Sequence, residues 1–104
     1  MKKLVTIVAL ACFTLALTAM AATMTGYISD SHCGAKHQDG SAASIKCVTS
    51  CVKGMNADPV FVSGDKVYKL SDKTKVMDFL GKKVTINGTA TEDTITITSV
   101  KAAQ

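Results

Sequence analysis

Lys82-Lys83-Val84-Thr85-Ile86-Asn87-Gly88-Thr89-Ala90 and Thr94-Ile95-Thr96-Ile97-Thr98-Ser99-Val100 are the two segments that decide the fold. In both segments aliphatic residues alternate with polar ones, so that Val84, Ile86, Ile95 and Ile97 share one face and the threonines lie on the other. Alternation with a period of two residues indicates β-strands, and β-branched residues on both faces favour them further. The sequence therefore predicts two neighbouring strands, over residues 82–90 and 94–100, that Thr91-Glu92-Asp93 connects.

The residues before this pair predict a hairpin and a short helix. Residues 59–62 and 66–70 have the composition of strands, and Ser63-Gly64-Asp65 between them is a hairpin signal. Asp72 is suited to cap a helix and Gly81 to end it. The inward face of that helix would consist of Val76, Phe79 and Leu80.

Nearer the N-terminus the pattern predicts a strand, a polar loop and a second helix. Residues 23–30 alternate weakly and predict the strand, and residues 32–41 are rich in Gly, His, Asp and Ser, as loops are. The helix is expected over residues 44–53, capped by Ser41 or Ser44, with Gly54 as a left-handed C-terminal residue. Its buried stripe would be Ile45, Val48 and Val52.

The order of these elements favours one fold class. Five strands with a helix between the third and the fourth is the order of the OB-fold, a small, partly open Greek-key barrel. We therefore expect a mainly β protein with a five-stranded OB-fold-like barrel, one helix inserted after strand 1 and one between strands 3 and 4. An α+β sandwich with one open sheet is the alternative.

The first 21 residues have the three parts of a secretory signal peptide. Lys2 and Lys3 are followed by an apolar run over residues 4–17, and Ala19-Met20-Ala21 fits a cleavage site. An uncleaved anchor is the rival reading, but the run is short for a membrane span. We expect residues 1–21 to be the signal, residues 22–104 to form a single OB-like domain without a membrane span, and the mature chain to be periplasmic or secreted.

The composition of residues 22–104 excludes some partners. Removal of the two leader lysines leaves ten lysines against eight acidic residues, a net charge of +2, and the chain has no arginine and no tryptophan. Proteins that bind single-stranded nucleic acid need a basic groove with stacking aromatic residues. We therefore expect no nucleic acid, and an unknown envelope or extracellular partner.

One constellation could carry chemistry, and it lies in the insertion over residues 32–56. All three cysteines after the leader and both histidines fall within 20 consecutive residues. The Cys₃His set has the spacing C-x3-H-x9-C-x3-C, and this set would suit Zn²⁺, while soft thiolates suit Cu(I) equally. On a helix Cys47 and Cys51 lie about 40° apart, at the edge of the valine stripe, and can face the preceding loop. The expected metal ligands are Cys33, His37, Cys47 and Cys51, with His32 in reserve.

Two other readings of the same residues stay open. In an oxidising compartment Cys33 would pair with Cys47 or Cys51, because neighbouring cysteines on one helical face are too far apart for a relaxed disulfide. The domain would then be a structural or interaction domain stapled by one disulfide, with one thiol left over. Alternatively, His32 beside Cys33 would lower the pKa of the Cys33 thiol. Cys33 would then be a reactive thiol, and the domain would be a thiol-redox protein.

The sequence favours binding or structure over catalysis. It contains no Ser-His-Asp set, no paired carboxylates and no Gly-rich phosphate loop. No cofactor other than the metal ion is expected.

The motifs resemble a family of small exported bacterial proteins of unknown function. The resemblance is carried by Thr25 to Ser31, by Cys33-Gly34-Ala35-Lys36-His37 followed by Cys47 and Cys51, and by Gly81 to Thr85 with Asp93 to Thr96. The Cys-Gly-x-Lys-His segment followed by Cys-x3-Cys is its specific part. The resemblance implies an OB-like barrel, places the site in the insertion and favours His37 over His32 as a ligand, but it implies no activity.

Overall fold

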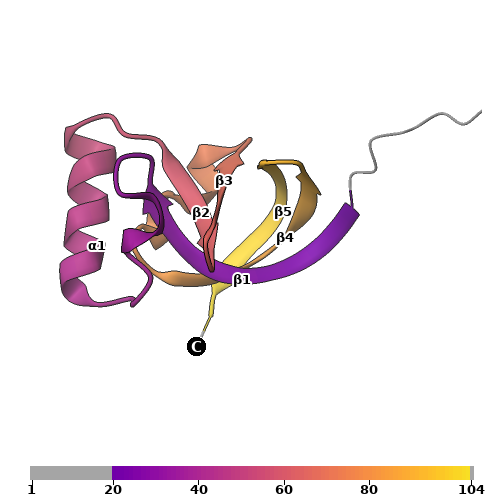
Figure 1. The fold of residues 1–104 in the computed structure, drawn as a ribbon, viewed down its shortest axis with the longest axis horizontal. Helices are drawn as coiled ribbons and strands as arrows, with labels where there is room; N and C mark the ends of the chain where they lie inside the picture. Colours follow the sequence, from indigo (N-terminus) through magenta and orange to yellow (C-terminus); the bar gives the residue numbers. More distant parts are fainter. Residues whose placement is uncertain (1–19, 104) are drawn as a thin grey trace, which may run out of the picture.

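The computed structural model describes residues 20–103, and they form a closed five-stranded barrel (Figure 1). The strands follow one another around the barrel in the order β1-β2-β3-β5-β4. Their bounds are Met20–Asp30 for β1, Pro59–Ser63 for β2, Lys66–Leu70 for β3, Lys83–Thr91 for β4 and Thr94–Ala102 for β5. The predicted mainly β, OB-like barrel is confirmed.

The barrel closes because β1 pairs with two strands and β3 meets β5. The C-terminal end of β1 pairs antiparallel with β2, and its longer N-terminal part pairs antiparallel with β4. The last contact is short and parallel: Lys69 lies opposite Thr94, and Leu70 opposite Ile95. This parallel contact joins the two antiparallel hairpins into a closed sheet, so the open-sheet sandwich is wrong.

The core is built on the strand faces that the alternation predicts, and buried residues of the inserted helix and of the segment between β3 and β4 join it. Val84 and Ile86 are fully buried, and Ile95 and Ile97 are nearly so. Phe61 of β2 is the largest fully buried side chain and packs in the same cluster. The C-terminal segments therefore form the expected pair of strands with the expected face inward.

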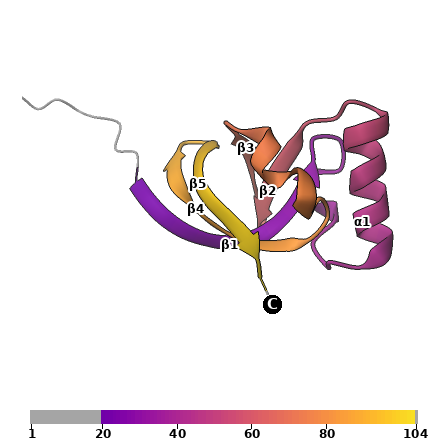
Figure 2. The same cartoon turned by 180° about the vertical axis from the view of Figure 1, so that it is seen from behind.

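The predicted insertion separates β1 from β2 and stands at one end of the barrel (Figures 1 and 2). It contains a 3₁₀ turn, η1 (Gly34–Lys36), then α1 (Ala42–Thr49), which continues without a break into one π-helical turn, η2 (Ser50–Gly54). Val48 and Val52 are buried as predicted, and Ile45 is half-buried. The insertion thus packs its valine stripe on the barrel end.

The ends of the inserted helix agree with the prediction at the start and differ at the finish. Ser41 caps α1, since its side chain accepts the backbone N–H of Ser44 at 3.1 Å. Gly54 is not left-handed; that conformation is taken by Asn56, with φ of 57°. The π turn carries the helix to Gly54. After it, the carbonyl of Cys51 accepts the N–H of Ala57, so the left-handed residue that ends the helix is Asn56, two residues after the expected Gly54.

The second predicted helix, between β3 and β4, is a 3₁₀ helix, η3 (Lys73–Phe79). Asp72 caps it by accepting the N–H of Thr74 at 3.2 Å. Gly81 follows with φ of 77°, and a Cβ atom at this position would lie 2.5 Å from Cα of Ile45. The glycine that was expected to end this helix therefore also lets the backbone approach α1 closely.

β1 begins earlier than predicted. It includes Met20 and Ala21, which pair with Ala90 and Thr89 of β4, whereas the alternation suggested a start at Thr23. These are the last two residues of the expected signal peptide. The rest of that expected segment lies outside the described residues.

Candidate metal centre

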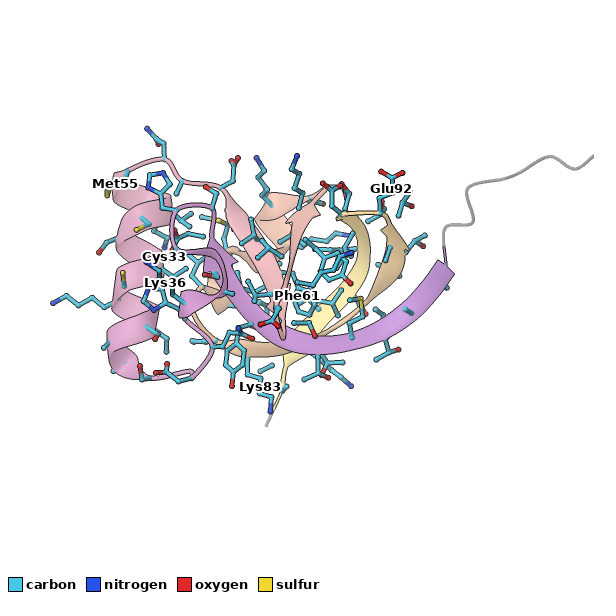
Figure 3. The ribbon with its side chains drawn as sticks, in the orientation of Figure 1. Cys33, Lys36, Met55, Phe61, Lys83 and Glu92 are labelled. Carbon is cyan, nitrogen blue, oxygen red and sulfur yellow. The ribbon has the colours of Figure 1, made fainter. Side chains whose placement is uncertain are left out.

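Cys33 is held at the end of β1 by a tight turn built on Asp30. The Oδ1 atom of Asp30 accepts the backbone N–H groups of His32 and Cys33, both at 2.9 Å. Ser29 donates its hydroxyl to the carbonyl of Gly34 at 2.7 Å, and Gly34 adopts a left-handed φ of 54°. These contacts turn the chain immediately after the barrel strand and place Cys33 beside α1 (Figure 3).

Cys47 and Cys51 come from the inserted helix on the other side of this turn. Cys47 lies in the last turn of α1, and Cys51 lies in the π turn η2. The neighbouring Val48 and Val52 are buried, whereas both cysteines are half-buried. The helix therefore presents its two thiols at the border between its packed and its solvent-exposed faces, as the wheel geometry predicted.

The three sulfur atoms converge. The Sγ atoms of Cys33, Cys47 and Cys51 all lie within 4.8 Å of one another, and all three thiols are free. We call these three residues the cysteine cluster. Cys33 and the two helical cysteines, which are far apart in the sequence, thus lie together between the turn after β1 and the inserted helix.

The structure leaves both histidines outside this set of mutually close ligand atoms. Nδ1 of His37 lies 3.2 Å from the hydroxyl of Ser44, which in turn donates to Asp39 at 2.7 Å. His32 is exposed. The prediction of His37 as the fourth ligand is therefore not part of the observed cluster and stays a prediction.

The electrostatics of the cluster favour protonated thiols in the absence of a cation. Burial, the Asp30 carboxylate and Cys47 raise the pKa of Cys33. Burial and Asp30 likewise raise the pKa of Cys51 to about 11. This is opposite to the lowered pKa that the Cys33–His32 pair suggested, because burial and, after it, the negative charge of Asp30 raise the pKa of Cys33.

Asp30 is the residue of this site that the sequence reasoning missed. Its side chain is fully buried, and its Oδ2 atom has no hydrogen-bond partner among the described residues. No lysine in residues 20–103 forms an ion pair with it; the ion pair there joins Lys73 to Asp58. Its place at the end of a strand, three residues before a cysteine, was a usable signal, because Asp commonly accepts N–H groups two or three residues later.

The residues of the cluster fit a thiophilic metal ion. Three convergent sulfur atoms are the donor set that Zn²⁺ and Cu(I) share. A buried carboxylate oxygen without a partner is costly unless a donor or a cation faces it. The same arrangement also puts Cys33 within reach of either helical thiol, so it fits both disulfide pairings that the spacing left open.

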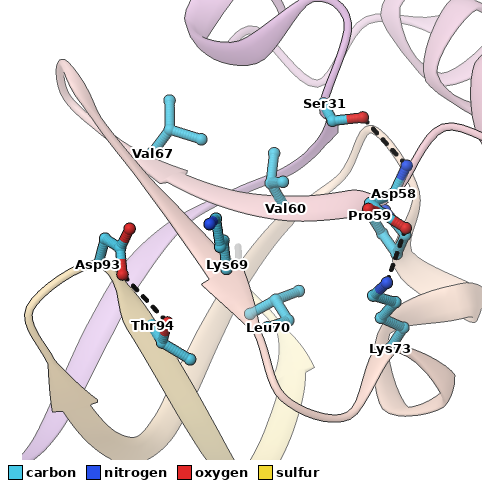
Figure 4. A pocket seen from close by; sticks show the side chains of 10 residues that line it. All are labelled: Ser31, Asp58, Pro59, Val60, Val67, Lys69, Leu70, Lys73, Asp93 and Thr94. Atoms are coloured by element: carbon cyan, nitrogen blue, oxygen red, sulfur yellow. Dashed lines mark hydrogen bonds and ion pairs between the residues drawn. The ribbon is translucent and has the colours of Figure 1, made fainter.

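A cavity lies elsewhere, on the barrel wall (Figure 4). It has a volume of about 480 Å³ and is bounded by β2, β3 and the β4–β5 turn. Its lining mixes lysines and aspartates over an aliphatic floor and contains no cysteine or histidine: Ser31, Asp58, Pro59, Val60, Val67, Lys69, Leu70, Lys73, Asp93 and Thr94. Because this mixture singles out no ligand chemistry, the cysteine cluster is the better candidate site.

No helix within residues 20–103 is long and apolar enough to cross a membrane. Comparisons of the chain with models of protein families, with curated proteins and with solved structures find no match. The candidate function therefore follows from the geometry and chemistry of the cysteine cluster.

Proposed function

We propose that this protein is an exported small domain that binds a thiophilic metal ion, Zn²⁺ or Cu(I), through Cys33, Cys47 and Cys51. The observation that carries the proposal is the convergence of three free thiols within 4.8 Å. A single disulfide uses two sulfur atoms, whereas a metal ion uses all three. The half-buried position leaves the cluster accessible to an ion while the valines beside it stay packed.

His37 is proposed as an auxiliary ligand for Zn²⁺, which prefers four. Its ring lies in the same insertion but contacts Ser44, so this role requires the ring to leave that contact. Cu(I) is stable with sulfur ligands alone and would leave His37 where it is. A His37→Ala variant therefore lowers the affinity for Zn²⁺ under this proposal and leaves that for Cu(I) unchanged.

A structural role is the second candidate, favoured by the same closeness of Cys33 to the helical cysteines. A disulfide from Cys33 to Cys47 or Cys51 would fix the insertion to the end of β1, and the barrel would then serve an envelope or extracellular partner. Two thiols would be oxidised to one disulfide and pass two electrons and two protons to a thiol oxidase or another disulfide. One thiol would remain.

One preparation distinguishes the two candidates. The protein is recovered from the compartment to which it is exported, its bound metal is measured by elemental analysis, and its free thiols are counted under denaturing conditions. Metal in a one-to-one ratio with three free thiols supports the metal site. One free thiol without metal supports the disulfide and contradicts the metal proposal.

Matched variants assign the ligands. Single serine substitutions of Cys33, Cys47 and Cys51 should each lower the affinity for added Zn²⁺ or Cu(I) in the reduced protein by at least about 10-fold, since each removes a ligand. Ser50→Ala changes an exposed residue of the same helical turn and serves as the control. Equal affinity in the cysteine variants and the control would refute the assignment.

Export is tested separately. The proposal expects a periplasmic or secreted chain that begins at Ala22, after removal of residues 1–21. Cell fractionation followed by mass spectrometry of the intact protein measures both the compartment and the first residue. A cytoplasmic chain that retains residues 1–21 would contradict export and leave the metal site to its own test.

A further inference from the structure

The cysteine cluster borders a buried carboxyl group that forms no ion pair with any of the residues that the structure describes. Asp30 is fully buried, and its Oδ1 atom is used twice, by the N–H groups of His32 and Cys33. Its Oδ2 atom is buried and has no hydrogen-bond partner within residues 20–103. These two N–H contacts fix the carboxylate against the backbone of the residue that carries the first thiol.

Such an arrangement is unfavourable without a compensating cation. A buried carboxylate normally has its oxygens satisfied by donors or is paired with a positive side chain. Among the residues that the structure describes, Oδ2 of Asp30 has neither a hydrogen-bond donor nor a positive side chain as a partner. The lysines of the insertion, Lys36, Lys46 and Lys53, are exposed. Asp30 is also tied directly to the cluster, because its Oδ1 atom accepts the backbone N–H of Cys33 at 2.9 Å.

We propose that Asp30 is a specificity-determining residue of this site, whose carboxylate makes the cysteine cluster favour a dication such as Zn²⁺ relative to the monocation Cu(I). The inference rests on the metal-binding function proposed above and names the ion that the site is built to hold. Asp30 acts through its charge, since the mutually close ligand atoms are the three sulfurs and do not include its oxygens.

The preference for a dication follows from the total negative charge that surrounds the bound ion. Binding converts thiols to thiolates, so three negative sulfurs then surround the ion while a fourth negative group is fixed beside them. In a partly buried site such charges are weakly screened, and a dication offsets one more unit of charge than a monocation. Removing the carboxylate therefore lowers the affinity for Zn²⁺ more than that for Cu(I).

Asp30→Asn is the first test variant. Asparagine retains an oxygen that accepts the N–H groups of His32 and Cys33, so the turn is preserved while the charge is lost. In the reduced, purified protein we expect the Zn²⁺ affinity, measured against a chromogenic chelator, to fall about 10- to 100-fold, the range for groups that support metal ligands. The Cu(I) affinity, measured against bicinchoninate, should fall by only about 3- to 10-fold, because the Coulomb energy of a monocation with the carboxylate is half that of a dication.

Two further variants complete the experiment. Asp65→Asn removes the same charge from an exposed residue of the β2–β3 turn and should leave the ratio of Zn²⁺ to Cu(I) affinities unchanged. Asp30→Ser keeps a short acceptor for the turn and should shift the ratio in the same direction as asparagine. Far-UV circular dichroism of each variant reports the fold independently of the metal.

The outcomes separate the inference from the function on which it rests. If the unaltered protein binds neither ion, the proposed function itself fails. If it binds metal but both Asp30 variants keep its ratio of affinities, or lose both affinities to the same degree, Asp30 supports only the fold and the inference is overturned. A selective loss of Zn²⁺ affinity supports it.

Discussion

At the residue scale, the thiols of the cysteine cluster are set up to hold protons rather than to react. A reactive cysteine needs a lowered pKa, which positive neighbours supply. Cys33 and Cys51 instead meet burial and the Asp30 carboxylate, and both pKa values are raised. This disfavours the thiol-redox reading and suits a site in which a cation displaces the protons.

The first prediction concerns alkylation of the metal-free, reduced protein. With a pKa of about 11, Cys51 should react with iodoacetamide at pH 7 at least about 10-fold more slowly than a free cysteine. The rate should rise about 10-fold per pH unit between pH 7 and 9, because only the thiolate reacts. Peptide mass spectrometry measures each site; a faster reaction than that of N-acetylcysteine would contradict the raised pKa.

The second prediction concerns Asp39, at the start of the inserted helix. Its carboxylate accepts the N–H of Ser41 and the hydroxyl of Ser44, and these bonds lower its pKa to about 2. Since the pKa of Asp39 in the folded protein lies below its ordinary value of 3.8, the stability that this carboxylate contributes is complete above about pH 4 and is lost as pH falls through about 2.

Asp39→Asn removes this titration. Chemical unfolding of both proteins at several pH values should show the stability advantage of the native residue shrinking between pH 4 and pH 2. A constant difference across that range would show that the charge of Asp39 makes no net contribution to the fold.

At the candidate site, the sequence predicts those residues whose side-chain type alone indicates metal binding. The three cysteines follow from their type and spacing. The missing residue, Asp30, reads in the sequence as a polar strand end, and only its burial shows the unpartnered oxygen. The position of His37 was likewise not predictable, because the competing contact with Ser44 depends on how the loop over residues 37–44 folds.

At the element scale, the position of α1 against the barrel depends on Gly81. A side chain there would need a left-handed φ of 77° and would meet the backbone of Ile45 at 2.5 Å from Cα and 2.9 Å from N. Both the strain and the clash oppose any residue with a Cβ atom. The close approach of these two backbones fixes where the helical thiols lie.

The third prediction is that Gly81→Ala lowers the free energy of unfolding by about 1–3 kcal/mol, the cost of a strained left-handed residue, and weakens metal binding by shifting α1. Denaturant unfolding and a Zn²⁺ titration measure the two effects. Gly54→Ala is the matched control, since a Cβ atom there meets nothing within 4 Å. A loss as large at Gly54 as at Gly81 would contradict the explanation.

Elements with strong local signals were predicted well, and those set by tertiary contacts were not. The period-two alternation around Val84 and Ile95 predicted β4, β5 and their buried face. The π turn η2 and the left-handed Asn56 were not predicted, since the residues of 50–54 suit an α-helix equally well. The closure of β3 on β5 rests on two residue pairs, which is too short a contact to leave a sequence pattern.

At the scale of the whole molecule, the barrel and the insertion share one hydrophobic core. The buried cluster that contains Phe61 and Ile86 also contains Val48 and Val52 of the insertion, while the half-buried thiols lie between the end of β1 and the helix. A metal ion at the cysteine cluster would therefore stabilise the insertion and the barrel together.

The fourth prediction follows from mass action. Free Zn²⁺ at 100 times its dissociation constant should stabilise the folded protein by about 2.7 kcal/mol. For a domain of this size that raises the melting temperature by about 10–20 °C. Differential scanning fluorimetry of the reduced protein measures the shift, which should vanish in a variant with all three cysteines changed to serine. An equal shift in that variant would mean that the ion binds elsewhere.

The extension of β1 back to Met20 has a consequence for the proposed removal of residues 1–21. The peptide bond between Ala21 and Ala22, where a signal peptidase is expected to cut, lies inside a strand that pairs with Thr89 and Gly88 of β4. Proteases cleave extended, unpaired backbone, so a precursor that folded first would shield its own processing site. If the protein is exported as proposed, cleavage therefore has to precede folding, and the new N-terminus pairs with β4 only after the chain has crossed the membrane.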